Sequence, residues 1–226
     1  MAKKGNKTDD QFAQVEDALT KTEQYIVDNQ KSLMTIVGTI VGIIALFSAY
    51  QSFYIASLEK EAQADMYMAE LYFQKDSFNL ALNGDGQYLG FVDIADEYSG
   101  TKAGELANYY AGISYLNTGD FENAIEYLDD FSSDDIILSS LALGCIGDAY
   151  MQLEDVDNAL SYYKDVASYT DNEFTTPRYM LKQAMIHEGN GDYADALALY
   201  KEIEENYKTS REGSGIEKYI ARAENR

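Results

Sequence analysis

Residues 112–124 read GISYLNTGDFENA, and 35 positions later residues 147–159 read GDAYMQLEDVDNA. Glycine, tyrosine and alanine recur at the same places in both stretches. A third copy, GDYADA at residues 191–196, ends at Ala196, which lies 37 positions beyond Ala159. A period in this range is typical of helix–turn–helix units that bury their apolar faces only by stacking on one another. The sequence therefore predicts an all-α fold, a solenoid of helical hairpins.

Small residues mark the predicted contacts between paired helices, at Gly112, Gly147, Ala124, Ala159 and Ala196. Asp120 and Asp192 stand where an N-cap would satisfy the first amides of a second helix. Thr176 and Pro177 predict an N-cap followed by proline at the first helical position. This pattern resembles the tetratricopeptide repeat family over about residues 103–208, with His187 at the aromatic position of the third copy.

A degenerate copy precedes these three, with the expected relative spacing at Ala69, Tyr72, Phe78 and Ala81. The turn signal at Asn83–Gly86 predicts an insertion that splits its second helix. Near the C-terminus, apolar residues line one side of a predicted last helix at Ile216, Tyr219, Ile220 and Ala223. We expect about three to four repeats closed by a C-terminal capping helix.

Residues 33–55 read LMTIVGTIVGIIALFSAYQSFYI, without a charge. A helix of this length spans about 35 Å, against roughly 30 Å for the hydrocarbon core of a bilayer. The run is long, lies far from the start and lacks a small-x-small cleavage site, so we expect a transmembrane helix and not a signal peptide. The predicted parts are residues 1–32, a cytoplasmic segment with a short amphipathic helix; residues 33–55, the span; and residues 56–226, the repeat domain. The apolar side of the amphipathic helix is formed by Phe12, Val15, Leu19, Thr22 and Ile26.

The distribution of lysines predicts the orientation of the span. Five lysines precede it, whereas only Lys60 and Lys75 follow within about 20 residues, and positive charge favours the cytoplasmic side. We therefore expect a single-pass protein of the inner (cytoplasmic) membrane, with a cytoplasmic N-terminus and a periplasmic repeat domain. Small residues form a possible helix-pairing face at Gly38, Gly42, Ala45 and Ala49.

The formal net charge of -22 excludes some classes of partner. A surface this acidic repels phosphate backbones, so we expect no nucleic-acid partner. The sequence has no glycine-rich phosphate loop, no G-x-S-x-G elbow and no His/Glu metal pair, and it has one His and one Cys. These observations predict a protein-binding module and not an enzyme, without catalytic residues, metal, cofactor or small-molecule substrate.

The repeat pattern also predicts a binding surface. In the family it resembles, the groove-facing positions of each first helix lie three before, and one, four and five after, the small residue. The candidates for contact with a peptide or partner are Met66, Phe73, Tyr109, Ile113, Leu116, Asp148, Met151, Leu181 and Met185. Apolar and Met side chains suit unfolded or extended polypeptides or an inserted helix. Alternatively, the C-terminal helix or another repeat fills this groove.

The whole layout resembles the YfgM-like ancillary subunits of the bacterial protein-export channel. The resemblance is carried by residues 33–55, 76–86 and 104–131. It implies association with the SecYEG translocon, with a membrane-anchored chaperone of the PpiD type and with exported polypeptides. The alternative is a structural scaffold subunit of another cell-envelope complex, in outer-membrane assembly or cell division.

Overall fold

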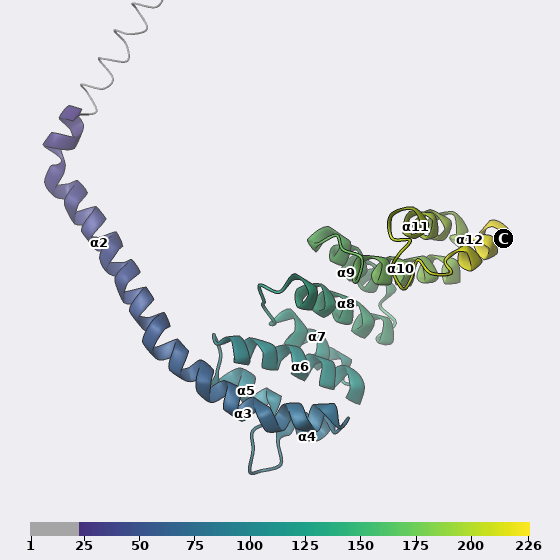
Figure 1. Ribbon diagram of the computed structural model, residues 1–226, viewed down its shortest axis with the longest axis horizontal. Helices are drawn as coiled ribbons and strands as arrows, with labels where there is room; N and C mark the ends of the chain where they lie inside the picture. Colours follow the sequence, from purple (N-terminus) through teal and green to yellow (C-terminus); the bar gives the residue numbers. More distant parts are fainter. Residues whose placement is uncertain (1–22) are drawn as a thin grey trace, which may run out of the picture. The chain divides into compact units, whose positions relative to one another are not determined.

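The computed structural model (Figure 1) describes residues 23–226. These form two units with their boundary between Ile55 and Ala56. The described residues form helices joined by turns and loops, with no β-strand. Most of the predicted amphipathic helix, with Phe12, Val15, Leu19 and Thr22, lies outside the described residues. Ile26 lies in a helical segment at residues 23–28 and is exposed.

The first unit contains the apolar helix α2 (Gln30–Ala49) and the π-helix η1 (Tyr50–Ile55). Among the described residues, one helix is long and apolar enough to cross a membrane, and it includes α2. No residue of α2 is buried, and Leu46 is 74% exposed. The hydroxyls of Thr35 and Thr39 donate to the carbonyls of Lys31 and Thr35, so their polar groups are satisfied within the helix.

The second unit consists of helix pairs that stack on one another along the chain (Figure 1). The pairs are α3 (Ala56–Gln74) with α4 (Phe78–Asn83) and α5 (Phe91–Glu97); α6 (Lys102–Thr118) with α7 (Phe121–Asp129); α8 (Ile136–Gln152) with α9 (Val156–Tyr169); and α10 (Thr176–Asn190) with α11 (Tyr193–Asn206). A last helix, α12 (Glu217–Glu224), packs on α11. The predicted solenoid, its split first repeat and its capping helix are confirmed.

Each pair has a small residue from both of its helices in its core. The first helices supply Ala69, Gly112, Gly147 and Ala184, and the second helices supply Ala81, Ala124, Ala159 and Ala196. All six alanines are 0% exposed. A Cβ on Gly112 would lie 3.2 Å from the Ala124 carbonyl oxygen, and one on Gly147 would lie 3.3 Å from that of Ala159. Larger side chains at these positions would separate the helices.

The turn inside each pair has a residue in the left-handed conformation. These residues are Asp76 (φ 55°), Gly119 (φ 84°), Glu154 (φ 60°) and Gly191 (φ 87°). In all four turns the next residue donates its N–H to the carbonyl five positions back, as Asp120 does to Tyr115 at 3.0 Å. The four hairpins therefore share one backbone geometry, although only two of them have the glycine that favours it.

Side-chain caps follow the prediction in part. The Asp120 carboxylate accepts the Asn123 N–H at 3.3 Å, as expected for an N-cap. Asp192 is also an N-cap residue but makes no capping hydrogen bond with its side chain. The prediction for Thr176 and Pro177 was wrong by one position, because α10 begins at Thr176. The Thr176 hydroxyl instead accepts the Asn172 N–H at 3.0 Å, which ties the preceding loop to the helix.

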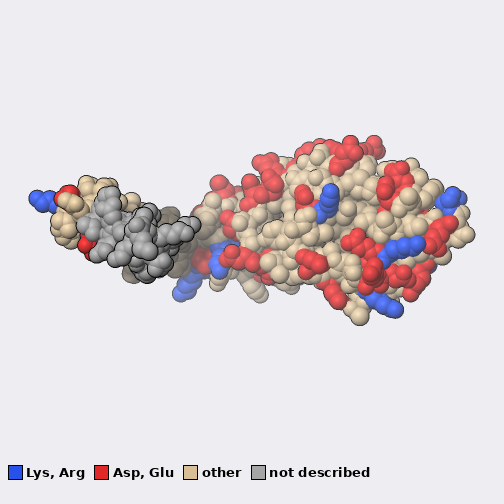
Figure 2. Space-filling view, turned by 90° about the horizontal axis from the view of Figure 1, so that it is seen from above, with Lys and Arg blue, Asp and Glu red and all other residues tan. Residues whose placement is uncertain are grey.

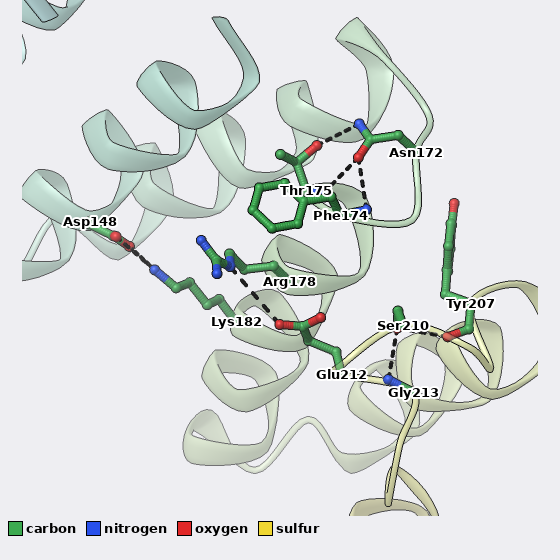
Figure 3. A network of polar contacts seen from close by, with 10 residues as sticks. All are labelled: Asp148, Asn172, Phe174, Thr175, Arg178, Lys182, Tyr207, Ser210, Glu212 and Gly213. Atoms are coloured by element: carbon green, nitrogen blue, oxygen red, sulfur yellow. Dashed lines mark hydrogen bonds and ion pairs between the residues drawn. The ribbon is translucent and has the colours of Figure 1, made fainter. Parts of the chain in front are cut away.

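One hydrogen-bonded motif recurs where the first and last repeats end. The Thr101 hydroxyl donates to the Tyr98 carbonyl at 2.7 Å and accepts the Gly104 N–H at 2.9 Å. The same two bonds, at the same lengths, join a second set of residues, drawn in Figure 3: Tyr207, Ser210 and Gly213. In the first copy the motif leads into α6, and in the second it leads towards α12. The capping helix therefore follows the position at which a further repeat would begin.

We predict that Gly144→Ala destabilises the domain. A Cβ there would lie 1.8 Å from Cζ of Tyr179, whose buried ring cannot move aside because it stacks on Tyr163. The expected loss, about 1–3 kcal/mol in the free energy of unfolding, exceeds the gain of about 0.5–1 kcal/mol from replacing a helical glycine. Urea unfolding of the full chain in detergent, followed by circular dichroism, measures it.

Gly189→Ala is the matched control, because a Cβ on Gly189 has no atom within 4 Å and its helical backbone accepts alanine. This variant should be about 0.5–1 kcal/mol more stable than the unsubstituted chain. Equal stability of the two alanine variants would contradict the packing described for Tyr179.

Candidate functional site

The predicted groove positions of the first repeat lie within its core. Met66 is 4% exposed and packs in a cluster with Ala69 and Phe91. The ring of Phe73 lies 5.0 Å from that of Tyr110 and 6.2 Å from that of Phe91, centroid to centroid. Side chains from α5 and α6 thus occupy the space in front of α3. Met66 and Phe73 are not brought together with the other candidates.

Tyr109 and Ile113 of α6 are half-buried and lie at the contact between the second and third repeats. Both contact the core around Leu128 and Ile146. The Tyr109 ring lies 5.2 Å from that of Phe131, and burial raises the pKa of its hydroxyl to about 12. These two residues therefore hold neighbouring repeats together, and little of either side chain faces solvent.

Three of the candidates meet at one pocket of about 540 Å³. Leu116 comes from the C-terminal turn of α6, and Asp148 and Met151 come from the last two turns of α8. The full lining is Leu116, Asn117, Phe121, Asp148, Met151, Gln152, Tyr163 and Lys182. We call this the central pocket. The capping helix does not fill it, since α12 packs on α11.

An ion pair crosses the central pocket between two repeats (Figure 3). Lys182 Nζ of α10 lies 2.5 Å from Asp148 Oδ1 and 2.7 Å from Oδ2. Tyr163 donates its hydroxyl to the same carboxylate at 2.6 Å, and the pKa of this tyrosine is raised, first by burial and then by that hydrogen bond. Lys182 Nζ also lies 5.2 Å from the centre of the Tyr179 ring. The charges of Lys182 and Asp148 therefore neutralise each other. Leu116 and Met151 provide the apolar part of the pocket.

The remaining two candidates, Leu181 and Met185, line a second pocket of about 560 Å³. It lies between α10, the turn at residues 211–215 and α12. We call this the terminal pocket. Its lining is Arg178, Leu181, Lys182, Met185, Arg211, Glu212, Ser214, Lys218 and Tyr219.

The sequence reasoning missed Lys182 and the cations of the terminal pocket. Lys182 lies two positions before the small residue Ala184, which is not a groove position by the repeat pattern. Its long side chain nevertheless reaches Asp148 on the neighbouring repeat. The only sequence signal was the concentration of Lys and Arg after residue 176 in a chain that is otherwise strongly acidic.

The candidate helix-pairing residues share one side of α2. Gly38, Gly42, Ala45 and Ala49 are all exposed, and a Cβ on Gly38 or Gly42 would have no atom within 4 Å. A strip of small residues of this kind allows close approach of another helix.

Stacked helical hairpins of this kind form a class whose surfaces bind other polypeptides. Residues 109–173 and 145–211 each match the family model described as tetratricopeptide repeat.

Two similar solved structures are crystal structures of a Podosopora anserina protein described as a kinesin light chain with nearly identical TPR-like repeats, one of them a single-substitution variant. Each has a TM-score of 0.54 and 12% identity; the matches cover 74% of this chain and 86% and 87% of those chains. They support the solenoid fold alone. No curated protein matches the sequence.

A tetratricopeptide fold is a protein-interaction scaffold and is generally not an enzyme. The sequence has a single cysteine, and its surroundings make its thiol unreactive. Cys145 packs in the cluster around Ile146 in α8, and burial, with the nearby Asp148 carboxylate, raises the pKa of its thiol to about 12. A thiol with this pKa is protonated at neutral pH and is a poor nucleophile.

We predict that iodoacetamide labels Cys145 slowly at pH 8 in the native chain and quickly in urea. A raised pKa keeps the reactive thiolate scarce at this pH, and unfolding removes the burial that causes it. Mass spectrometry over time measures the reaction. Ser168→Cys, at an exposed position of α9, supplies an internal control in the same chain. Equal labelling rates at positions 145 and 168 in the native chain would contradict the environment described.

Proposed function

We propose that the protein is a membrane-anchored, periplasmic protein-interaction module that accompanies exported polypeptides at the SecYEG translocon, together with a PpiD-type chaperone. The observation that carries the proposal is the central pocket. It is open, it has an apolar part, and it is built from three successive repeats on a chain that also has one fully exposed apolar helix.

The chemistry of α2 supports a membrane anchor. Its large apolar side chains are exposed on all sides, so in water it would present a hydrophobic surface far larger than a soluble protein keeps. Such a helix can be surrounded by lipid without leaving these polar side chains unsatisfied, because its threonine hydroxyls donate hydrogen bonds within the helix. Tyr50 and Tyr54 of η1, which directly follows α2, stack at 5.2 Å, and aromatic rings favour the headgroup region. The lysines before the span support a cytoplasmic N-terminus.

The central pocket supports binding of extended polypeptide. Met151 is flexible and polarisable, and Leu116 adds a second apolar contact on the neighbouring helix. Asn117 and Gln152 lie beside them and offer amide groups to a peptide backbone, although one Asn117 N–H already donates to the Ile113 carbonyl at 2.7 Å. Such a lining binds many sequences weakly and not one sequence tightly, as a module serving exported proteins requires.

The link to the translocon rests on the resemblance of the span and of residues 76–86 and 104–131 to the YfgM-like subunits. Residues 76–86 contain the turn after α3, the helix α4 and the start of the inserted loop, where Asp85 accepts a hydrogen bond from Tyr72 at 2.7 Å. Residues 104–131 contain most of α6 and all of α7.

We predict that Leu116→Glu and Met151→Glu weaken the binding of an unfolded client about tenfold. Each places a carboxylate among apolar contacts, and an uncompensated charge at such a contact costs roughly 1–3 kcal/mol. The full chain in nanodiscs is titrated with a fluorescent, reduced and carboxymethylated model protein, and anisotropy is measured.

Ile136→Glu is the control, since it makes the same change at an exposed position of α8 that lines neither pocket. Melting curves of all three variants verify folding. Unchanged binding in both pocket variants would contradict the proposed groove.

We predict that a photoreactive residue at Val41, beside the small-residue strip, crosslinks translocon subunits in native membranes. At about 100° per residue, Ile40 lies on the opposite side of α2, and a probe there should give fewer of these products. Recovery of only outer-membrane assembly or cell-division proteins would favour the scaffold alternative.

Protease treatment of spheroplasts should degrade the repeat domain; protection would overturn its periplasmic placement.

A further inference from the structure

The positive charges of the repeat domain lie mostly near its C-terminal end. Residues 56–175 have four Lys and Arg and 24 Asp and Glu, whereas residues 176–226 have eight and nine. Acidic side chains are the commoner charged groups on the face shown in Figure 2. The last repeat and its cap are therefore nearly neutral on a domain that is otherwise strongly acidic, and four of their cations line the terminal pocket.

These four cations are not equally neutralised. Lys182 is paired with Asp148. Arg178 Nε lies 4.0 Å from Glu212 Oε1, a long contact that leaves most of the guanidinium donors available (Figure 3). Arg211 and Lys218 are exposed and have no carboxylate within 4.0 Å among the described residues.

Arg222 shows what a neutralised cation looks like in the same region. Its guanidinium donates to Glu188 at 2.6 Å, and this hydrogen bond is the main reason that the pKa of Glu188 is lowered. No comparable bond holds Arg211 or Lys218, so the terminal pocket carries an excess of positive charge.

Apolar groups lie beside these cations. Met185 is 50% exposed, Leu181 lies one turn before it on α10, and the ring of Tyr219 forms the side towards α12. Lys218 Nζ lies 4.7 Å from the centre of the Tyr219 ring, so the ring holds this cation at the edge of the pocket. A ligand that suits both parts has carboxylates and a large apolar side chain close together.

We propose that the terminal pocket binds an acidic segment of a polypeptide, with at least two carboxylates next to a large apolar side chain. Arg211 and Lys218 receive the carboxylates, and Met185 and Tyr219 receive the apolar group. Charge complementarity selects this occupant, because a basic segment would be repelled here. The 24 acids of residues 56–175 disfavour a long phosphate chain.

The proposal rests on the proposed function in taking the ligand to be a polypeptide, and it adds a preference in sequence. Lys182 lines both the central and the terminal pocket. A single extended polypeptide can therefore place neutral apolar residues in the central pocket and an acidic segment in the terminal pocket.

The test uses the full chain in phosphatidylcholine nanodiscs and fluorescein-labelled ten-residue peptides. One peptide alternates Glu with Leu, a second Lys with Leu, and a third Gln with Leu. The Glu peptide should bind at least about tenfold more tightly than the other two, and this preference should fall as salt rises from about 0.05 to 0.5 M. Equal binding of the Glu and Gln peptides would overturn the proposal.

Charge reversal locates the site. Arg211→Glu combined with Lys218→Glu should weaken binding of the Glu peptide at least about tenfold. Lys208→Glu is the matched control, an exposed cation of the same region that does not line the pocket, and should change binding less than about twofold. If Lys208→Glu weakens binding of the Glu peptide as much per reversed charge as the double variant does, the effect is general electrostatic attraction and the proposed site is wrong.

Two further outcomes are informative. If added phosphatidylglycerol nanodiscs bind the unsubstituted full chain in its phosphatidylcholine nanodiscs and abolish peptide binding, the pocket recognises lipid headgroups and the peptide proposal is wrong. If the Glu peptide fails to bind while the unfolded client still binds through Leu116 and Met151, only this inference fails. Loss of client binding in Leu116→Glu and Met151→Glu with the Glu peptide still bound supports both pockets as separate sites.

Discussion

The close approach of helices at small residues determines both the solenoid and its pockets. Gly144 and Gly147 lie one turn apart on α8, and the missing side chains make room for the rings of Tyr179 and Tyr163. These rings stack at 5.6 Å and join the third repeat to the fourth. Lys182 Nζ lies within 5.5 Å of both ring centres and reaches Asp148 from there. The polar part of the central pocket thus depends on glycine, with no side chain, at positions 144 and 147.

The period and the small residues made the fold predictable from sequence, because both follow directly from how the helices pack. The hairpin turns were less predictable. Gly119 and Gly191 indicate a residue in the left-handed backbone conformation, but Asp76 and Glu154 adopt the same conformation without being glycine. There the packing of the two helices imposes a backbone that the residue itself disfavours. The boundary error at Thr176 has a similar origin, since a side chain expected to cap α10 holds the preceding loop.

The predicted binding groove stays a prediction, and the structure brings only some of its positions together. Leu116, Asp148 and Met151 line the central pocket, whereas Tyr109 and Ile113, on the same helix as Leu116, pack between the second and third repeats. In the first repeat the second helix is split, and α5 brings Phe91 against Phe73, which fills the groove position with core. Helical periodicity picked out Leu181, Met185 and Tyr219 of the terminal pocket but not its cations, because part of its lining comes from the turn at residues 211–215 and from the reach of long side chains.

The modest size of the central pocket gives the anchor a physical role in the proposed function. Covering two partly exposed apolar side chains contributes only about 2–4 kcal/mol, which corresponds to dissociation constants near or above about 1 mM. Such binding is negligible for a free protein at cellular concentrations. A tether that holds the repeats where exported chains emerge raises the effective concentration to roughly the same millimolar range. Under the proposed function, weak, unselective contacts would then be occupied at the membrane and empty elsewhere, so the anchor would supply selectivity that the apolar contacts lack.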